Sequence, residues 1–309
     1  MSAADKPTLA VIGGSRAYDL LAKGGFGKEA ECVRPGTPFG KSAPVHLFEG
    51  DGFSYYFVSR HGEKGYDLSA PFVNYRANIY ALKELGVQRI IAWSGPGAVN
   101  PDYKPGHFAV PHDVIDQTRR RESTFFENTG LGFIRMSEPF CPEVRGALIS
   151  AEGKEGSHCH ENGVYLCAEG PRLETSAEIK MFSQWGADLV GMTLVPELFL
   201  AREMEMCYAA LCYVTNYAEG VKERDFRKGE LFEGMLSEDE RRNVESAVGL
   251  FPRVVTSALK SLASMERRTE DRKERRCNCR HAMERYRKSG KIGTDILKEV
   301  NKNRRMGGS

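Results

Sequence analysis

The stretch RIIAWSGPG, residues 89–97, decides the fold class of this chain. Its first five residues are largely apolar and are followed by turn residues, which is typical of a strand buried on both faces of a sheet. The same order, a short apolar run and then glycine with polar residues, recurs at residues 9–15, 163–170 and 188–193. The sequence therefore predicts several buried strands, each leading into a polar turn.

Segments with helical spacing separate these strands. Residues 74–85 and 175–185 carry apolar residues at helical intervals, and Gly86 and Gly186 follow them as helix-ending glycines. Residues 195–206 predict a further helix, and residues 54–59 and 208–214 predict two more strands. Ser237 precedes three acidic residues, which predicts the N-cap of a helix running toward residue 263. This alternation predicts an α/β fold, a single domain with a central mixed sheet flanked by helices.

The composition excludes several classes of protein. The chain has 309 residues, of which 41% are hydrophobic and 28% charged, and its formal net charge is +2. This balance excludes a strongly basic nucleic-acid binder, and no apolar run approaches the roughly 20 residues of a membrane span. The N-terminus shows no secretory signal, so we expect a cytoplasmic protein without membrane contact. In that compartment most of the eight cysteines are expected to be reduced and buried.

The charge is unevenly distributed along the chain. Residues 265–309 hold 15 Lys or Arg and 7 Asp or Glu, a formal charge of +8, which leaves residues 1–264 at −6. We therefore expect a domain over residues 1–264 and a basic tail over residues 265–309 that is helical or partly disordered. The tail has one aromatic residue, Tyr286, so base stacking is not indicated and we do not expect nucleic-acid binding.

Two glycine-rich segments suggest nucleotide binding but miss its requirements. The segment GTPFGKS, residues 36–42, has three residues between its glycines, whereas a phosphate-binding P-loop needs four. It predicts a turn before a strand instead. The turn Gly13-Gly14-Ser15 lacks the third glycine of a dinucleotide-binding fingerprint.

Two short clusters contain metal-ligand residue types. Adjacent side chains in His158-Cys159-His160 point in different directions, and no second ligand pair lies at a supporting spacing, so we expect an exposed loop. Cys277 and Cys279 stand in a very basic segment, which discourages metal binding. A plain reduced pair is the favoured interpretation for these two cysteines, a redox or disulfide pair is the next alternative, and metal binding is the least favoured one. We expect no metal.

Polar residues gather where the predicted strands end, which is where ligands bind in α/β sheets. They are Ser15, Arg60, His61, Ser94, Gly95, residues 169–174, Met192, Thr193 and Asn216. Hydroxyls, a guanidinium fork and glycine-flanked N–H groups together make an anion site that suits phosphate. No acid is placed to orient His61, so the pattern does not match a Ser/His/Asp triad.

Eight motifs in consistent order resemble the methylthioadenosine phosphorylase branch of the trimeric purine nucleoside phosphorylases. They are SRHG (59–62), VNYRANI (73–79), PG (105–106), IDQT (115–118), EPFC (138–141), EGPR (169–172), WGAD (185–188) and GMTLVPE (191–197). The resemblance covers residues 8–262. It implies cleavage of a purine nucleoside by inorganic phosphate to free base and sugar 1-phosphate. It also implies a homotrimer and no metal or organic cofactor.

The resemblance implies a role for each residue at the sheet edge. The phosphate-binding residues are Ser15, Arg60, His61, Ser94, Gly95 and Thr193. Met192 lies under the ribose, and His61 and Asn216 are the expected catalytic residues. The family usually has Thr-Ala where this chain has Ser94-Gly95, and the serine keeps the hydroxyl while the glycine keeps the N–H. Such catalysis rests on positioning phosphate and stabilising charge on the leaving base, with no nucleophilic side chain.

Two departures from the adenine-specific pattern predict the substrate base. That branch has Thr-Asp-Tyr-Asp where this chain has Thr215-Asn216-Tyr217-Ala218, and an amide can donate to O6 whereas a carboxylate cannot. Glu174 resembles the glutamate with which inosine and guanosine phosphorylases accept a hydrogen bond from N1–H. Adenine presents a bare lone pair at N1, so both changes predict a 6-oxopurine base. The expected substrate-binding residues are Met192, Glu174, Asn216, Tyr217 and Ala218.

The 5′ side of the sugar corresponds to residues 235–242, MLSEDERR. Met235 and Leu236 suit a methylthio group, whereas Ser237 and Glu238 suit a hydroxyl and are the expected specificity residues there. We therefore expect inosine and guanosine as substrates in purine salvage, with S-methyl-5′-thioinosine as the alternative and methylthioadenosine next. A non-enzymatic purine or phosphate sensor is the alternative from another class. A nucleoside hydrolase is disfavoured because the sequence shows no aspartate-rich calcium cluster.

Overall fold

The computed structural model describes residues 6–50, 52–127, 129–153, 155, 158–223, 228–231, 236–268 and 277–306. Within these residues an eight-stranded sheet has the order β11-β9-β14-β7-β1-β6-β5-β2. Its four central strands run parallel: β14 (Cys207–Tyr213), β7 (Arg89–Ser94), β1 (Leu9–Gly13) and β6 (Phe53–Ser59). The outer strands are β11 (Cys159–His160), β9 (Phe108–Ala109), β5 (Val45–Gly50) and β2 (Lys28–Val33). The central strands are wholly or mostly buried, as their apolar runs predict.

A second sheet, of five strands in the described part of the chain, has the order β10-β12-β13-β8-β15. Its strands are β10 (Asp113–Gln117), β12 (Val164–Ala168), β13 (Leu189–Gly191), β8 (Gly97–Ala98) and β15 (Asn216–Tyr217). The chain passes from β7 into β8 and from β14 into β15 within a few residues. The two sheets therefore join where Ser94, Gly95 and Asn216 lie.

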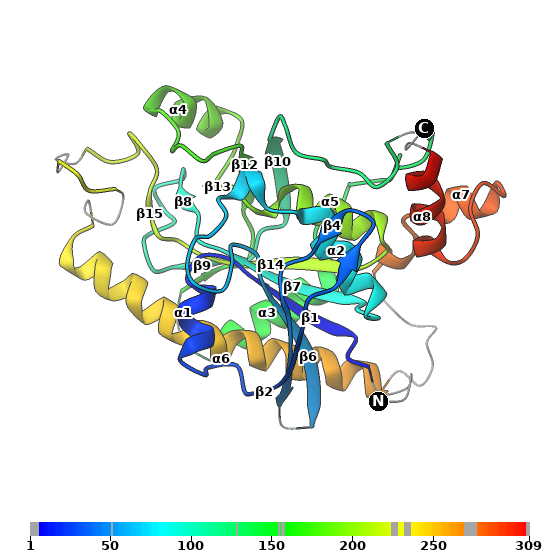
Figure 1. Ribbon diagram of the computed structural model, residues 1–309. Helices are drawn as coiled ribbons and strands as arrows, with labels where there is room; N and C mark the ends of the chain where they lie inside the picture. The colour runs from blue at the N-terminus through cyan, green and yellow to red at the C-terminus, as the bar shows by residue number, and fades with distance from the viewer. Residues whose placement is uncertain are drawn as a thin grey trace.

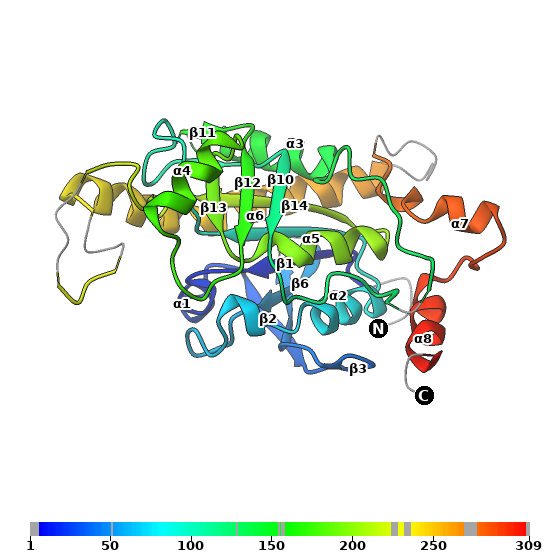
Figure 2. The same cartoon turned by 90° about the horizontal axis from the view of Figure 1, so that it is seen from above.

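Helices cover the large sheet on both faces (Figures 1 and 2). Helix α3 (Pro142–Glu152) packs against α6 (Glu238–Arg268) and also contacts β14. Helix α2 (Tyr75–Glu84) packs against α5 (Leu194–Glu203), and α5 also contacts β14. The shorter helices are α1 (Ala17–Ala22), η1 (Ala70–Phe72) and α4 (Ser176–Gln184). None of the described helices is long and apolar enough to cross a membrane. The expected α/β architecture is confirmed.

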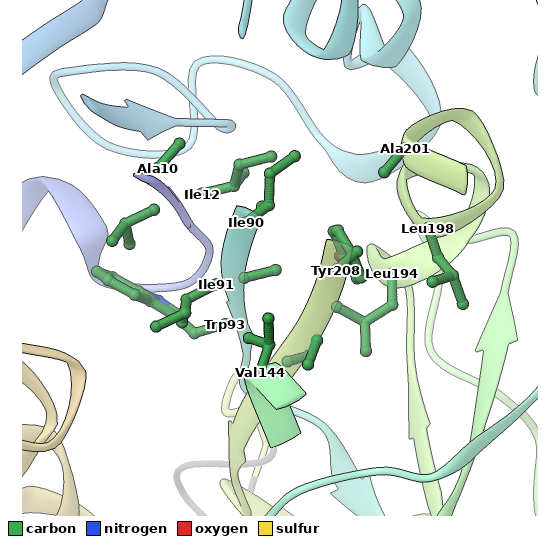
Figure 3. Packing of buried hydrophobic residues seen from close by; sticks show 14 of the residues in the cluster. Ala10, Ile12, Ile90, Ile91, Trp93, Val144, Leu194, Leu198, Ala201 and Tyr208 are labelled. Carbon is green, nitrogen blue, oxygen red and sulfur yellow. The ribbon is translucent and has the colours of Figure 1, made fainter. Parts of the chain in front are cut away.

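The core lies between these layers. Trp93 of β7 is fully buried and packs against Phe251 of α6, with ring centroids 4.8 Å apart. Figure 3 shows Val144 of α3 and Leu194 of α5 approaching the strands from different sides. Because side chains from both helical layers interdigitate with β7 and β14, the ends of those strands are held rigidly for a binding site.

The basic tail also contributes to this core. Its described part forms η3 (Cys279–His281), α7 (Glu284–Lys288) and α8 (Ile296–Met306), seen beside α2 and α5 in Figure 1. Met283, Tyr286 and Val300 are buried in the same hydrophobic cluster as the strands. The Asn303 amide donates to the Phe125 carbonyl at 2.7 Å. The tail therefore packs on the body, and α6 runs past the expected boundary at residue 264.

Local signals in the sequence account for several element ends. Asn74 caps α2 by accepting from the Ala77 N–H at 3.1 Å, and Gly86 follows that helix with φ +98°. The segment resembling a P-loop forms a two-stranded hairpin, β3 (Gly36–Thr37) with β4 (Gly40–Lys41), ahead of β5. A turn before a strand is what its spacing predicts.

Candidate active site

Three adjacent parallel strands bring the first site residues together. β7, β1 and β6 are neighbours, so their ends lie at one edge of the sheet, with Ser94 as the last residue of β7 and Ser15 and Arg60 just after β1 and β6. The Arg60 N–H donates to the Gly13 carbonyl at 3.1 Å. Gly14 is required here because a Cβ at that position would lie 2.5 Å from the Trp93 carbonyl oxygen and 2.8 Å from Arg60 Nη1.

Arg60 is held by a buried carboxylate. Its Nε and Nη2 donate to the two carboxylate oxygens of Glu197 at 3.0 and 2.6 Å, and its Nη1 donates to the Trp93 carbonyl at 2.9 Å. Tyr208 donates its hydroxyl to the same carboxylate at 2.6 Å. Burial lowers the pKa of Arg60, but the Glu197 carboxylate raises it by more than burial lowers it. The net pKa is raised, so the guanidinium stays charged. Three of its five N–H donors are used in these bonds, which leaves two for a ligand.

His61 follows Arg60 and is also buried. Burial and the neighbouring Arg60 lower the pKa of His61 to about 4, so the imidazole is neutral near pH 7. Its Nδ1 lies 2.9 Å from the Leu68 carbonyl. A carbonyl only accepts, so Nδ1 carries the proton and Nε2 is left as an acceptor. The Tyr66 ring lies beside this imidazole, and its hydroxyl contacts Ser15 Oγ.

Hydroxyl groups from both sheets meet at the strand junction. Thr193 Oγ1, which follows β13, donates to Ser94 Oγ at 3.3 Å, and Ser94 Oγ lies 3.0 Å from the Tyr165 hydroxyl. Ser94 and Thr193 are both buried. A Cβ on Gly95 would lie 2.8 Å from Thr215 Cγ2, so this packing favours glycine where the resembling family has alanine.

Met192 and the loop after β12 form a neighbouring wall. A Cβ on Gly170 would come within 2.5 Å of Met192 Sδ, so the two segments are in close contact. Arg121 ties them together through four backbone carbonyls: Met192 at 2.5 Å, Val195 at 2.6 Å, Glu169 at 2.5 Å and Ala168 at 3.2 Å. This guanidinium fixes the ends of β12 and β13 relative to each other.

The orientation of the Asn216 amide follows from the Tyr217 carbonyl, which can only accept a hydrogen bond. The Thr215 hydroxyl lies 2.6 Å from Asn216 Oδ1, and Asn216 Nδ2 donates to the Tyr217 carbonyl at 2.8 Å. Nδ2 has two N–H bonds, so one stays available to a ligand. The Lys222 ammonium lies 4.0 Å from the Tyr217 ring centroid, and Ala218 is buried.

Glu174 lies just before α4 with its side chain partly buried. Burial is the main reason that its pKa is raised. The nearby Arg172 forms a bidentate pair with Glu178 at 2.7 and 2.8 Å, so it is already bound to another carboxylate.

The residues expected at the 5′ side have a different setting. Ser237 Oγ accepts from the Glu240 N–H at 3.2 Å, and the Ser237 N–H donates to Glu240 at 2.9 Å, which is a capping box at the start of α6. Glu238 is exposed, Leu236 is buried, and Met235 lies outside the described residues. Among the described residues, no hydrogen bond or ion pair joins Ser237 or Glu238 to the rest of the site.

Two positioning residues are missing from the sequence-based prediction. Glu197 holds Arg60, and an acid inside the apolar run LVPELFL is a signal that a buried cation must face it. Arg121 gave no such signal, because the run RRR at residues 119–121 has the pattern of a solvated loop.

The histidine cluster also departs from expectation. His160 lies in β11, is partly buried and stacks on Tyr103 with ring centroids 3.8 Å apart, so the expected exposed loop is correct only for His158. His107, the residue before β9, lies beside these two histidines, and its Nδ1 is 3.0 Å from His160 Nε2. Burial and the two other histidines lower the pKa of His107 to about 4. Spacing within one short motif could not reveal this third histidine.

The chain is similar to known proteins in both sequence and fold. Residues 8–260 match the family model described as Phosphorylase superfamily. The chain is 41% identical to 6-oxopurine nucleoside phosphorylase of Pyrococcus furiosus over 90% of this chain and 98% of the relative. It is 39% identical to the probable S-methyl-5′-thioinosine phosphorylase of Methanothermobacter thermautotrophicus, over 89% and 88% of the two chains. A crystal structure of methylthioadenosine phosphorylase from an antarctic soil metagenomic library matches with a TM-score of 0.75 and 31% identity, over 90% and 91% of the chains. The chain belongs to the phosphorylase superfamily, and its relatives place it among the purine nucleoside phosphorylases.

Proposed function

We propose that this protein cleaves 6-oxopurine nucleosides, inosine and guanosine, with inorganic phosphate to give the free base and ribose 1-phosphate in purine salvage. The observation that carries the base preference is the orientation of Asn216. The Tyr217 carbonyl can only accept, so it fixes Nδ2 as the donor beside it, and the spare N–H on Nδ2 is the group left to donate to a base. An N–H donor matches O6 of a 6-oxopurine and opposes the 6-amino group of adenine.

The phosphate site is proposed at the edge shared by β1, β6 and β7. Arg60 supplies two free N–H donors, and Ser15, Ser94 and Thr193 supply hydroxyls. His61 is neutral with Nε2 as acceptor, so it fits a phosphate that still carries one proton. Accepting that hydrogen bond would orient a bare phosphate oxygen toward the sugar.

The chemistry needs no covalent intermediate with the protein. A phosphate oxygen forms a bond to the anomeric carbon as the glycosidic bond breaks, and the bonding electrons leave with the purine. Negative charge then develops on the purine, where Asn216 donates to O6 or N7 and stabilises it. Met192 lies against Gly170 and is proposed to support the ribose face.

Glu174 is proposed to accept the N1–H of the base. Its partly buried carboxyl has a raised pKa, but an N1–H donor would favour the ionised form. Adenine offers a lone pair at N1 instead, and two facing acceptors inside a site cost about 1–3 kcal/mol. Glu174 and Asn216 therefore select against adenine at two separate atoms.

S-methyl-5′-thioinosine is the second candidate substrate. The relative named for that activity supports it, as does the buried side chain of Leu236 at the start of α6. The Ser237 hydroxyl already accepts a hydrogen bond from the Glu240 N–H at the start of α6, which weakens the prediction that it binds a 5′-hydroxyl.

A homotrimer is proposed because the wall of the site is exposed. Tyr66, Leu68 and Phe72 are 56%, 44% and 70% exposed, although Tyr66 contacts Ser15 and the Leu68 carbonyl holds His61. Large apolar side chains at a site edge mark a surface for a partner. A second copy of the chain covering this segment would shield the phosphate site from water.

A substrate panel with and without phosphate tests the proposal. Wild-type protein is expected to cleave inosine or guanosine only when phosphate is present and to discriminate against adenosine by on the order of 10⁴-fold. Asn216→Asp should lose 6-oxopurine activity, because O6 would then meet an acceptor. The double variant Asn216→Asp/Glu174→Ser should favour adenosine more than Asn216→Asp alone.

Each other outcome contradicts a defined part of the proposal. Turnover without phosphate would indicate a hydrolase, and no turnover with any nucleoside would favour a sensor. Comparable rates on inosine and adenosine would overturn the base assignment while leaving phosphorolysis intact. Methylthioinosine in the same panel decides between the two 5′ substituents.

A further inference from the structure

Four cysteines that are far apart in sequence meet at the base of the C-terminal tail. The Sγ atoms of Cys141, Cys207, Cys277 and Cys279 all lie within 4.8 Å of one another, and all four side chains are buried. Cys207 Sγ is 3.5 Å from Cys277 Sγ. All eight cysteines belong to the described part of the chain, and none forms a disulfide there.

We propose that these four cysteines bind a single structural Zn²⁺ ion that attaches the tail to the body. A tetrahedral ion with Zn–S bonds of about 2.3 Å places its four sulfurs about 3.8 Å apart. The separations in this cluster, 3.5 Å for Cys207 and Cys277 and no more than 4.8 Å for any pair, are close enough for four sulfurs to share one ion. Four protein ligands leave no open coordination position, which is the mark of a structural site and not a catalytic one.

The ligands come from three rigid places in the fold. Cys141 caps α3, and its N–H donates to the Tyr208 carbonyl at 2.8 Å, which sets it beside the first residue of β14, Cys207. Cys207 is itself held by a 2.9 Å bond from its N–H to the Gln88 carbonyl. Cys279 opens η3, with Cys277 two residues earlier. Body and tail thus contribute two ligands each.

The electrostatic surroundings fit a tetrathiolate site. Zn²⁺ with four thiolates carries a net charge of −2, so it needs positive groups nearby. Arg202 interacts electrostatically with Cys279, is only 6% exposed, and its buried Nε has no hydrogen-bond partner among the described residues. The N-terminus of α3 adds partial positive charge at Cys141. Basic side chains repel a free Zn²⁺ ion, but they stabilise the negatively charged complex that the ion forms with four thiolates.

Metal analysis of the full chain, purified under reducing conditions with zinc supplied, tests the site. About one Zn²⁺ per chain is expected. Binding deprotonates four thiols, so removing the metal should raise the number of alkylatable thiols by four. Co²⁺ in place of Zn²⁺ should give the intense visible bands and sulfur-to-metal charge-transfer absorption of tetrahedral thiolate coordination.

Variants separate this cluster from the other metal-ligand residues of the chain. Cys279→Ser should lose the ion, whereas Cys279→His should keep it, because three cysteines and one histidine are also a zinc ligand set. Two matched controls, His160→Ala and Cys32→Ser, remove ligands from the other His- and Cys-containing groups and should retain the full zinc content.

The proposal fails on any of three results. One is wild-type protein that stays metal-free with four reactive thiols after zinc is supplied. Another is that the cluster holds something other than zinc: disulfides found by mass analysis, or iron found by its visible absorption. The third is a metal that is lost in His160→Ala or Cys32→Ser but kept in Cys279→Ser. The cobalt spectrum of the wild-type chain decides the matter even if a cysteine variant does not fold.

Discussion

At the scale of single residues, the buried pair of Arg60 and Glu197 determines the anion site. Neither side chain is accessible to solvent, and three bonds fix the guanidinium plane. Removing one partner of a buried pair leaves an uncompensated charge, which costs about 3–5 kcal/mol. Glu197 therefore matters to phosphate binding without being expected to touch phosphate.

Glu197→Gln should lower the free energy of unfolding by about 3 kcal/mol and raise the KM for phosphate more than that for inosine. Denaturant unfolding and steady-state kinetics with each substrate varied measure the two effects. Arg60→Ala, the control that removes the cation, should lose about 2–4 kcal/mol of phosphate affinity. An unchanged phosphate KM in both variants would show that the anion binds elsewhere.

His61 predicts a pH dependence of stability. Its pKa is about 4 in the folded chain, against an ordinary value of 6.5, so between these values the unfolded chain binds a proton that the folded chain does not. Above pH 6.5 the histidine is neutral in both states and does not lower the free energy of unfolding. As the pH drops from 6.5 toward 4, protonation of the unfolded chain lowers the free energy of unfolding by up to about 3 kcal/mol.

Unfolding free energies of wild type and His61→Asn at pH 4, 5, 6 and 7 test this dependence. The wild type should lose more stability than the variant as the pH falls. Glu203 opposes the trend, since burial raises its pKa to about 7, but it is present in both proteins and cancels in the difference. Parallel curves for the two proteins would show that His61 is not held neutral.

At the scale of elements, Arg121 holds two strands of the second sheet in register with the loop that carries Glu169. Its guanidinium is almost fully buried and donates to carbonyls after β12 and β13. Arg121→Ala would leave those carbonyls without a donor.

We expect Arg121→Ala to lower the free energy of unfolding by about 3 kcal/mol and to raise the KM for the nucleoside. Arg121→Lys keeps the charge but cannot reach several carbonyls at once, so it should fall between wild type and alanine. Thermal unfolding and nucleoside KM are the measurements. A stable alanine variant with normal nucleoside KM would contradict the positioning role.

Elements with strong local signals were predictable from sequence. The apolar runs predicted β1, β7, β12, β13 and β14. Helical spacing and the glycines that follow it predicted α2 and α4, and the N-cap Ser237 predicted the start of α6. The edge strand β2 was not predicted, because it is largely exposed and lacks an apolar run. Its neighbour β5 was expected only as the strand after the turn at residues 36–42, without bounds.

The same distinction holds for the site. Residues directly after buried strands, such as Ser15, Arg60 and Ser94, were predictable as a group, because parallel strands end at one edge. Partners contributed from a distance were not, since nothing in the local sequence links Glu197 to Arg60 or His107 to His160. The four cysteines are the extreme case, because 70 residues separate Cys207 from Cys277.

At the scale of the whole molecule, the exposed segment around Phe72 is the proposed contact between copies of the chain. Phe72→Asp places a charge on a side chain that is 70% exposed here, so the isolated chain should fold normally. In a trimer that charge would be buried, and assembly should weaken. Light scattering should show a trimer for wild type and a smaller species for the variant. Wild-type protein that is monomeric and fully active would exclude the trimer.

The position of the first strand has a consequence for how the protein is made. β1 lies in the middle of the large sheet between β6 and β7, while β14 and the tail helices complete the core from the other end of the chain. A ribosome releases β1, β6 and β7 long before their last partners. The nascent chain therefore carries an unpaired β7 edge until β14 has been made, and uncovered apolar faces until the tail helices follow. The complete core can therefore form only after the C-terminal helices have been made.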